Sequence, residues 1–598
     1  MKFKIFLASF LVASLIGCSS NDTPVSTVSI PDEEIDVSIS IFDDELEHEF
    51  PTTAVLEEEP IEEIDVTLSP NGYPISQTQE LIFNLGVDPL TLDPQLNTAI
   101  DGGYVLNNTF EGLVREVGGE IIPATAQTWT IANVSEDMMD ELGVSSEALV
   151  YTFTLRDDVK WSDGVDVVAA DFEFAWKRAM NPETGGQYGN LFVSANILNA
   201  DLIMSGDVSY EELGVTALDD KTLQVVLTSP CEYFLALSIA NSFLPVREDI
   251  VTSDGSWSKD PALAVSNGPF VLSDYAIGDQ LVLTKNEHYW NADNVYLETI
   301  ICDMIVEAST ALTAFNSSNL HMNGTVPTDE LPQLIIESEE MYILPNIGTY
   351  YIAMNLEEDI FDDVNVRKAL SLAIDRELIV EQVTRGGETI ATGFVGPGFL
   401  DANGDEFMVV AGDYGISYNA DVEAAQAALS DAGYPGGEGF PTLEFLYNTN
   451  ETHQKIAQAI QEMWKQNLGI DVTLTNQEWA VFLESRTIGD YEIARNGWIG
   501  DYTDPNTMLE IFLSDHGQNT IRFDDEDYDN AMANARVTRG QERMEYLYEA
   551  QDILMEQHAI IPVYHYVYTW QVDNSVEGWE FAANGRPWLG DVVMVDRD

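Results

Sequence analysis

Basic side chains are scarce in this chain of 598 residues: 25 Lys and Arg stand against 103 Asp and Glu, a formal net charge of −78. Nucleic-acid binding depends on Lys and Arg contacts to phosphate, so the composition excludes nucleic acid as a partner. It also excludes adsorption to an anionic membrane surface through charge. The acidic excess gives either a well-solvated surface or a raised local concentration of cationic solutes.

Cysteine is scarce as well, with Cys18, Cys231 and Cys302 as the three examples. Their spacing matches no zinc-binding pattern. Cys231 and Cys302 would form a disulfide in an oxidising compartment or stay as two buried thiols, and the sequence leaves both possibilities open.

Sequence signatures of catalysis are missing. The chain has no Gly-x-Ser-x-Gly, His-Glu-x-x-His, Walker or Gly-x-Gly-x-x-Gly motif. The segment from Asp401 to Glu406 is only faintly similar to a calcium loop, because it lacks the full spacing and the terminal Glu, and a surface turn is the better interpretation. We therefore expect no enzyme activity, no metal and no cofactor.

The chain has no apolar run long enough to span a membrane, and a short apolar run lies near its N-terminus. Lys2 and Lys4 precede an apolar stretch from Ile5 to Ile16 that is too short for a stable membrane span. It ends in Leu-Ile-Gly-Cys18, which resembles a bacterial lipobox; an ordinary secretory signal with a chance Cys is the alternative. We predict a lipoprotein signal peptide over 1–17 and a lipid on Cys18, which would anchor the protein at the outer face of the cell membrane or in the periplasm.

The segment that follows has no positive charge. Between Lys4 and Arg115 there is no Lys or Arg, and from Ser19 to about Ser76 the chain is rich in Asp, Glu, Ser, Thr and Pro. Like charges repel and little apolar area is available for burial, so residues 18–78 are predicted to form an extended acidic tether.

From about Gln79 onward, strand and helix patterns alternate, which predicts an α/β fold with several domains. Alternating or continuous apolar residues predict strands over 80–84, 149–155 and 222–227. Helical spacing predicts helices over 170–180, 366–383 and 452–468, and the last of these would end at Gly469.

Aromatic residues beside isolated charges mark the best candidate site. Trp479 ends an Asn-Gln-Glu-Trp segment after a predicted strand, and Arg495, Trp498 and Asp501 lie close together around two glycines. A carboxylate beside aromatic rings suits an ammonium group and an Arg suits a carboxylate, so an extended zwitterionic ligand fits. An internal ion pair between Arg495 and Asp501 explains the same residues.

These segments belong to an ordered set of motifs that resembles the oligopeptide-binding proteins of bacterial peptide ABC importers, within the peptide and nickel solute-binding protein family 5. The resemblance runs from about Glu80 to near the C-terminus, and its motifs lie at 92–94, 110–113, 151–156, 160–164, 170–172, 266–270, 286–290, 366–370, 374–376 and 561–564. Residues 476–479 and 495–501 are similar to the oligopeptide branch.

The resemblance implies a two-lobed, periplasmic-binding-protein-like (class II) α/β fold with an additional inserted domain. Its implied boundaries are 79–110, 247–347 and 568–598 for domain I, 111–246 for domain II and 348–567 for domain III. Domains I and III would close over the ligand.

By the same resemblance, the protein captures short oligopeptides and, as a monomer, delivers them to the permease of an ABC transporter. Asp501 would bind the α-ammonium of the peptide, and Arg495 and His453 would meet its carboxylate. The remaining implied contacts are the backbone of Thr98, Ala99, Ile100, Gly497, Trp498 and Ile499, the basic Arg486, and the pocket-lining rings of Tyr188, Trp479, Trp498 and Tyr566. Thr384, followed by Arg385, stands where the family has a further Lys anchor, which leaves the preferred peptide length open.

Two other functions are compatible with the sequence. The same fold could be tuned to a cell-wall peptide, a signalling peptide or another solute, or it could serve a surface enzyme or adhesin. Turnover of a bound peptide would separate the last of these from the binding proteins. The preferred peptide, the permease and the type of cell envelope are not determined by the sequence.

Overall fold

The computed structural model describes residues 68–117, 120–251, 256–582 and 585–597, which belong to one compact unit. The predicted signal peptide, Cys18 and most of the predicted tether lie outside these residues. Within the described ranges, no helix combines the length and the apolar character that crossing a membrane requires.

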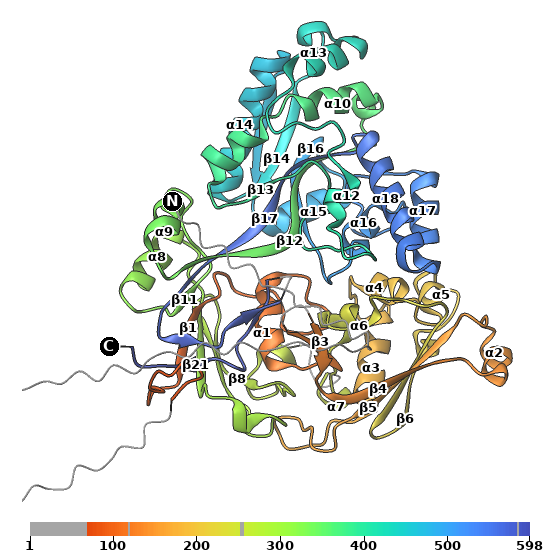
Figure 1. The fold of residues 1–598 in the computed structure, drawn as a ribbon, viewed down its shortest axis with the longest axis vertical. Helices are drawn as coiled ribbons and strands as arrows, with labels where there is room; N and C mark the ends of the chain where they lie inside the picture. The colour runs from red at the N-terminus through yellow and green to blue at the C-terminus, as the bar shows by residue number, and fades with distance from the viewer. Residues whose placement is uncertain (1–67, 118–119, 252–255, 583–584, 598) are drawn as a thin grey trace, which may run out of the picture. The chain divides into compact units, whose positions relative to one another are not determined.

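Eleven strands of the described chain form one mixed sheet (Figure 1). Its order is β15 (Val472–Gln477), β14 (Leu443–Asn448), β16 (Ile493–Ile499), β12 (Met341–Met354), β17 (Ile560–Val572), β11 (Met322–Asn323), β1 (Glu80–Asn84), β10 (Thr299–Asp303), β9 (Gln280–Lys285) and β8 (Phe270–Ala276), with β13 (Thr389–Ile390) paired to β17. The long strands β12 and β17 pair with each other and connect the two halves of the sheet. We call the half from β15 to β12, together with the helices and loops that pack on it, the β16 end, and the half from β11 to β8 the β1 end.

Helices cover both faces of the β16 end (Figure 1). On one face lie α10 (Val364–Leu372), α13 (Val422–Asp431) and α14 (Glu451–Leu468); on the other lie α15 (Trp479–Ile488), α16 (Asn506–Leu509), α17 (Glu526–Val537) and α18 (Gly540–Glu556). The apolar side chains of the strands pack into a separate core against each layer. This helix–sheet–helix arrangement confirms the predicted α/β class.

Helix α14 agrees with its prediction from the sequence. The side chain of Asn450 caps it by accepting the backbone N–H of His453, and Ile456, Ile460 and Trp464 are buried along one face. Gly469 ends the helix in the left-handed conformation at φ +75°, which a glycine adopts without strain.

The helix predicted over 366–383 is interrupted. α10 ends at Leu372, and Asp375 then caps a new turn, α11 (Arg376–Leu378), which continues as a π-helix over Ile379–Thr384. The interruption has a tertiary cause: the buried guanidinium of Arg376 donates hydrogen bonds to the carbonyl oxygens of Pro562 and Ser371. Pro562 lies far outside the predicted helix, so helical spacing alone could not indicate the break.

A second sheet has the order β4 (Ala126–Asn133), β5 (Leu149–Leu155), β7 (Thr222–Leu227) and β6 (Val215–Asp219). Around it lie α2 (Glu136–Leu142), α3 (Ala169–Met180), α4 (Gly189–Ser194), α5 (Ala200–Met204) and α6 (Phe234–Leu237). We call residues 120–251 the small-sheet unit. β5, β7 and α3 confirm three predicted elements, and aromatic side chains such as Trp161, Trp176 and Phe234 fill the core.

The shorter elements complete the fold. They are α1 (Ile100–Thr109), α7 (Glu248–Val251), α8 (Ala308–Asn316), α9 (Leu331–Glu337), α12 (Phe407–Ala411), and the two-stranded pairs β2 (Val114–Val117) with β3 (Glu120–Pro123), β18 (Val576–Glu577) with β21 (Val593–Met594), and β19 (Glu580–Phe581) with β20 (Pro587–Trp588).

The last residues of the predicted tether contact the folded part. Ile75 forms an isolated bridge with Val595, and the side-chain amide of Gln79 donates to the carbonyl oxygens of Ser76 and Met594. Residues 68–78 are therefore attached to the C-terminal segment.

Both described cysteines are free and buried. Cys231 belongs to the core of the small-sheet unit and Cys302 to the core of the β1 end. Of the two possibilities left open by the sequence, the disulfide is therefore wrong.

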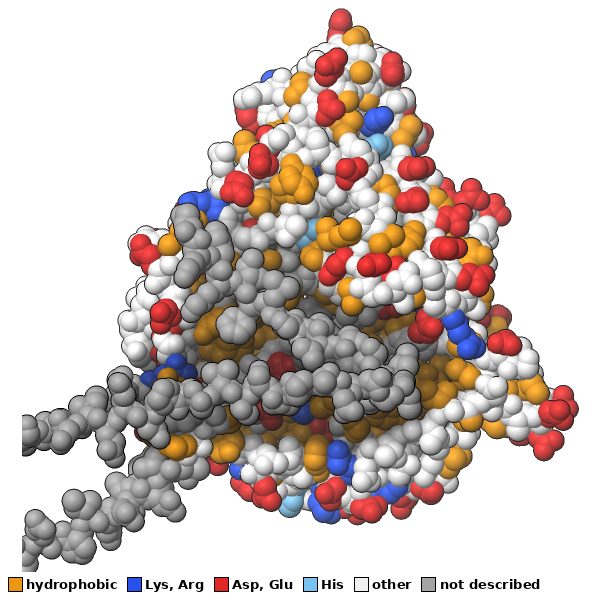
Figure 2. Space-filling model, viewed as in Figure 1, with side chains coloured by type: hydrophobic (Ala, Val, Ile, Leu, Met, Phe, Trp, Pro, Cys, Tyr) orange, Lys and Arg blue, Asp and Glu red, His pale blue; other side chains and the backbone are white. Residues whose placement is uncertain are grey.

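Acidic side chains are spread over the visible face of the molecule instead of gathering in one patch (Figure 2). This distribution favours the interpretation that the acidic excess solvates the surface.

Candidate functional site: a strand edge with opposite charges at its ends

β16 has an edge that is only partly paired within the described chain. β12 pairs with it from Gly348↔Ile499 to Met354↔Ile493, whereas β14 pairs only with Ile493 and Ala494. From Arg495 to Ile499 the edge on the β14 side therefore has no partner strand in the described part of the sheet. An extended peptide can add to such an edge through main-chain hydrogen bonds.

The negative end of this edge is Asp501, two residues beyond β16. Its backbone N–H donates to Oγ1 of Thr507 at 3.0 Å, and the backbone N–H of Gly500 donates to the carbonyl of Ile347 at 2.9 Å. These bonds fix the chain direction just where the strand ends. Burial raises the pKa of the Asp501 carboxyl to about 6, and the positive charge of Arg586 acts in the opposite direction.

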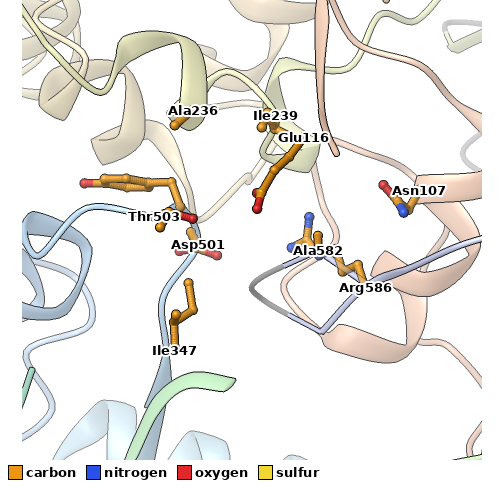
Figure 3. A pocket seen from close by; sticks show the side chains of 10 residues that line it. Asn107, Glu116, Ala236, Ile239, Ile347, Asp501, Thr503, Ala582 and Arg586 are labelled. Atoms are coloured by element: carbon orange, nitrogen blue, oxygen red, sulfur yellow. The ribbon is translucent and has the colours of Figure 1, made fainter. Parts of the chain in front are cut away.

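Asp501 faces a pocket where several separate parts of the chain meet (Figure 3). Figure 3 shows the side chains of Glu116, Asp501 and Arg586 directed toward one space, with Asn107 and Ile239 at its border. Two carboxylates and one guanidinium leave the pocket with a formal charge of −1 when all are ionised. A monovalent cation such as an α-ammonium group would neutralise it.

The positive end of the edge contains Arg495 and Arg486. Nε of Arg495 donates to Oδ1 of Asn448 at 2.6 Å, and Arg486 donates to Oδ1 of Asn496. Neither guanidinium forms an ion pair with a carboxylate among the described residues, although the chain is rich in acids. Burial lowers the pKa of Arg486 to about 10, which still leaves it protonated at neutral pH. Two cations with neutral partners form a site for an anion.

His453 adds to the positive end from the first turn of α14. Burial, together with the nearby charge of Arg495, lowers the pKa of His453 well below its ordinary value, so the ring is neutral. Its Nδ1 is buried without a hydrogen-bond partner in the described structure, as are Nε of Arg486, Oε1 of Gln477 and the hydroxyl of Tyr350. Such unsatisfied polar atoms are costly when buried, and a polar ligand would satisfy them.

One face of helix α15 carries Arg486 together with two aromatic rings that lie beside the arginines of the positive end. Trp479, Phe482 and Arg486 are spaced at i, i+3 and i+7, and the guanidinium carbon of Arg495 lies 5.4 Å and 5.1 Å from the ring centroids of Trp479 and Phe482. The carbon of Arg486 lies 4.9 Å from the ring of Phe482. The rings hold the two cations in place without neutralising them.

Gly497 lets an aromatic ring cross the middle of the edge. A Cβ atom at this position would lie 2.2 Å from the hydroxyl oxygen of Tyr566, a distance that no side chain allows. Trp498, its neighbour, is half-buried and donates from Nε1 to the carbonyl of Thr507, and Ile499 is half-buried at the end of the strand.

The other predicted contacts lie on different elements. Thr98 and Ile100 are exposed and Ala99 is the extended N-cap of α1, so this segment is a loop followed by a helix start. Tyr188 caps α4 in the small-sheet unit, where burial and the charge of Asp501 raise the pKa of its hydroxyl. Thr384 is buried, and its hydroxyl donates to the carboxylate of Glu388 at 2.9 Å.

The structure thus brings Arg495, Arg486, His453, Trp479 and Tyr566 together and places Asp501 at the opposite end of the same strand. Arg495 and Asp501 form no ion pair, so the interpretation of an internal Arg–Asp pair is wrong. Their side chains are available as two separate charges.

Several site residues could not be recognised from the sequence. Arg586 lies 85 residues after Asp501 in a turn, and Glu116 belongs to the short strand β2; only the fold brings them to the pocket. Phe482 had a usable signal, because it lies three residues after Trp479 and four before Arg486, which is helical spacing, although we predicted no helix over this segment.

Comparison with known proteins places the chain in a family. Residues 120–520 match the family model described as bacterial extracellular solute-binding proteins, family 5, middle part. The chain is 35% identical over 503 residues to the periplasmic murein peptide-binding protein MppA of Escherichia coli strain K12, with 83% of this chain and 89% of that protein covered. It is 34% identical over 513 residues to the oligopeptide-binding protein OppA of Bacillus subtilis strain 168, at the same coverage. The chain is a family 5 solute-binding protein.

Solved structures agree with this assignment and with the two-lobed fold. MppA of E. coli matches with a TM-score of 0.78 at 32% identity, covering 88% of this chain and 100% of that one. OppA of Haemophilus influenzae in complex with the peptide RPPGFSPFR gives 0.77 at 30% identity, covering 87% and 100%. An unliganded open form of MppA gives 0.65 at 32% identity, covering 88% and 99%. The arrangement here is closer to the peptide complex than to the open form.

Proposed function

We propose that this protein captures short peptides outside the cytoplasm and delivers them to the permease of an ABC transporter. One observation carries the proposal: a partly unpaired strand edge has a carboxylate at one end and two guanidinium groups without acidic partners at the other. An extended peptide is a zwitterion with main-chain hydrogen-bonding groups between its charges, and it is complementary to this arrangement. The peptide-binding relatives support the same conclusion.

The spacing of the charges suggests the size of the ligand. Asp501 lies six residues after Arg495, which is about 20 Å along an extended chain at roughly 3.3 Å per residue. An extended peptide rises by the same amount per residue, and the arginine side chains reach toward the ligand. We therefore expect peptides of roughly three to five residues to bind best.

The middle of the edge would accept varied sequences. Main-chain pairing does not depend on side-chain identity, and the neighbouring Trp479 and Tyr566 offer apolar surfaces with polar tips. Among the residues between the two charged ends, Arg495 to Asp501, no further acid or base occurs to select one charged side chain.

A second candidate is a peptide with more than one carboxylate, such as a murein peptide. The observation in its favour is that Arg495 and Arg486 together carry two positive charges, whereas an ordinary peptide C-terminus supplies one negative charge. The relative MppA is named as a murein peptide-binding protein. Mass spectrometry of ligands that co-purify with the native protein would distinguish cell-wall peptides from mixed nutrient peptides.

Titration calorimetry with tetra-alanine tests the main proposal. The free peptide should bind, whereas its N-acetylated and C-amidated forms should each bind much more weakly because one terminal charge is lost. Equal affinity for the three forms would contradict recognition through the two ends. Recovery of intact peptide after prolonged incubation would support a binding protein, and cleavage would show an enzyme.

We further propose that the protein acts as a monomer anchored through a lipid on Cys18, a residue outside the described structure. The lipobox-like segment before Cys18 motivates this proposal. Cys18→Ala should release the protein from membranes or block its processing. A mature N-terminus at another residue would contradict the anchor, and light scattering of the protein without its signal peptide would test the monomer.

A further inference from the structure

The small-sheet unit touches the β16 end at a stacked pair of tyrosines. Tyr502 directly follows Asp501, and its ring lies parallel to that of Tyr233, with centroids 5.2 Å apart and an interplanar angle of 6°. Both rings are buried. Tyr502 comes from the β16 end, yet it packs into the core of the small-sheet unit. Tyr233 is therefore one of the closest links between that unit and the loop that carries the ammonium anchor.

A buried ion pair lies against the same ring. Arg543, on α18, donates to both carboxylate oxygens of Asp504, at 2.6 Å and 2.9 Å. Its guanidinium carbon lies 4.6 Å from the ring centroid of Tyr233. Arg543 and Asp504 both belong to the β16 end and neutralise each other. The ring of Tyr233 therefore packs against an ion pair that forms without it.

A shared carboxylate forms a further connection. Glu510 accepts hydrogen bonds from the hydroxyl of Tyr502 at 2.9 Å, from Nδ2 of Asn506 at 3.1 Å and from the hydroxyl of Ser194. Ser194 ends α4 in the small-sheet unit, and its carbonyl accepts the hydroxyl of Tyr233 at 3.0 Å. Glu510 is buried, so loss of a donor leaves its charge less compensated.

These contacts occur in an arrangement that is closer to a peptide complex of a relative, with a TM-score of 0.77, than to an unliganded open form, with 0.65. Tyr233 and Ser194 come from one side of the contact, and Tyr502, Glu510 and Arg543 come from the other. If the two sides separate, the stack and the Ser194–Glu510 hydrogen bond are lost together.

We propose that Tyr233 and Ser194 form a latch with Tyr502, Glu510 and Arg543 that assembles when the lobes close, so that these five residues raise peptide affinity without touching the peptide themselves. The inference rests on the proposed peptide-binding function. A contact made only in the closed state shifts the equilibrium toward that state, and the apparent affinity rises with the closed fraction. Because the contact acts after binding, it slows dissociation more than it speeds association.

The test compares Tyr233→Leu with Tyr233→Phe, which keeps the ring and loses only the hydroxyl. Stopped-flow and calorimetric binding would use tetra-alanine with a free and with an acetylated N-terminus. Tyr233→Leu should weaken both peptides by the same factor, about tenfold or more, mainly through faster dissociation. Tyr233→Phe should stay within about threefold of the wild type.

Ser194→Ala is the second variant, because Tyr233 also belongs to a core and its loss could impair folding. It should weaken both peptides by about threefold to tenfold, leave the unfolding temperature of the ligand-free protein unchanged, and increase the radius of gyration of the peptide-loaded protein in solution scattering. Wild-type affinity and dissociation rate in Ser194→Ala would overturn the latch, as would a loss confined to the free-amine peptide. If the wild type itself binds no peptide, the proposed function fails instead.

Discussion

At one end of the β16 edge, the Asp501 carboxylate shares a pocket with Glu116 and with the positive charge of Arg586, whereas at the other end two guanidinium groups have only neutral hydrogen-bond partners. The Asp501 end offers one position for one ammonium group. The Arg495 end offers several donors from different elements: β16, α14 and α15. The contrast suggests that the first end fixes the register of a peptide, while the second tolerates carboxylates at more than one position.

The largest expected effect comes from the end with a single anchor. Asp501→Asn removes the charge that faces the α-ammonium, and breaking a buried charged contact costs about 3–5 kcal/mol. Free-amine peptides should bind two to three orders of magnitude more weakly, roughly, by calorimetry. N-acetylated peptides should be weak binders of the wild type and should change little in the variant.

The control for this variant is Asp490→Asn, which neutralises an exposed acid of the same end of the sheet. It should bind both peptides as the wild type does. Equal losses for free and acetylated peptides in Asp501→Asn, with a lower unfolding temperature in the absence of peptide, would show that Asp501 serves stability instead of recognition.

A smaller effect is expected at the end with several donors. Arg495→Gln removes one of two guanidinium groups, and Arg486 remains to attract the carboxylate. Affinity for peptides with a free C-terminus should fall by roughly one to two orders of magnitude. C-amidated peptides should be almost unaffected. A loss as large as that of Asp501→Asn would remove the contrast between the ends.

The pH dependence of peptide affinity gives a further way to distinguish the Asp501 end from the Arg495 end. Asp501, with a pKa raised to about 6, must be ionised to bind an ammonium group, and the bound ammonium lowers that pKa. Affinity for free-amine peptides is therefore nearly complete at pH 7 and is lost as the pH falls through 6, by about tenfold between pH 7 and pH 5. Acetylated peptides bound to the wild type, and any peptide bound to Asp501→Asn, should not show this loss of affinity between pH 7 and pH 5. An affinity for free-amine peptides that stays unchanged between pH 7 and pH 5 would contradict the assignment.

The smallest effect concerns the ring beside the positive end. Trp479 is about half exposed, and its ring lies 5.4 Å from the Arg495 guanidinium carbon. Trp479→Leu should weaken peptide binding by about twofold to fivefold, since an exposed cation–π contact contributes about 0.5–1 kcal/mol. Fluorescence of the remaining tryptophans or calorimetry would measure it. An effect above tenfold would mean that the ring contacts the peptide directly.

The sequence was sufficient where structure depends on neighbours along the chain. The strands at 80–84, 149–155 and 222–227 and the helix ending at Gly469 follow from apolar spacing and a left-handed glycine. The helix predicted over 366–383 failed because buried Arg376 donates to the carbonyl of Pro562, almost two hundred residues away. No local pattern contains that partner.

The site shows the same division. The aromatic and basic residues around Arg495 could be proposed because they lie near one another in sequence or match a family motif, and the structure brings them together. Arg586 and Glu116 could not be proposed, because the pocket around Asp501 exists only after several distant segments have folded against one another. Long-range electrostatic partners of this kind require the fold.

The two described cysteines carry a consequence for protein chemistry. Burial raises the pKa of both thiols, so neither reacts readily in the folded state. Cys302 lies inside β10. Sγ of Cys231 lies 3.8 Å from the carbonyl oxygen of Ser194, and the charges of Arg543 and Asp504, on the other side of the contact with the β16 end, affect the pKa of its thiol. A maleimide would therefore report two opening events in one sample. The alkylation rate of Cys302 would measure global unfolding, and the alkylation rate of Cys231 would measure separation of the small-sheet unit.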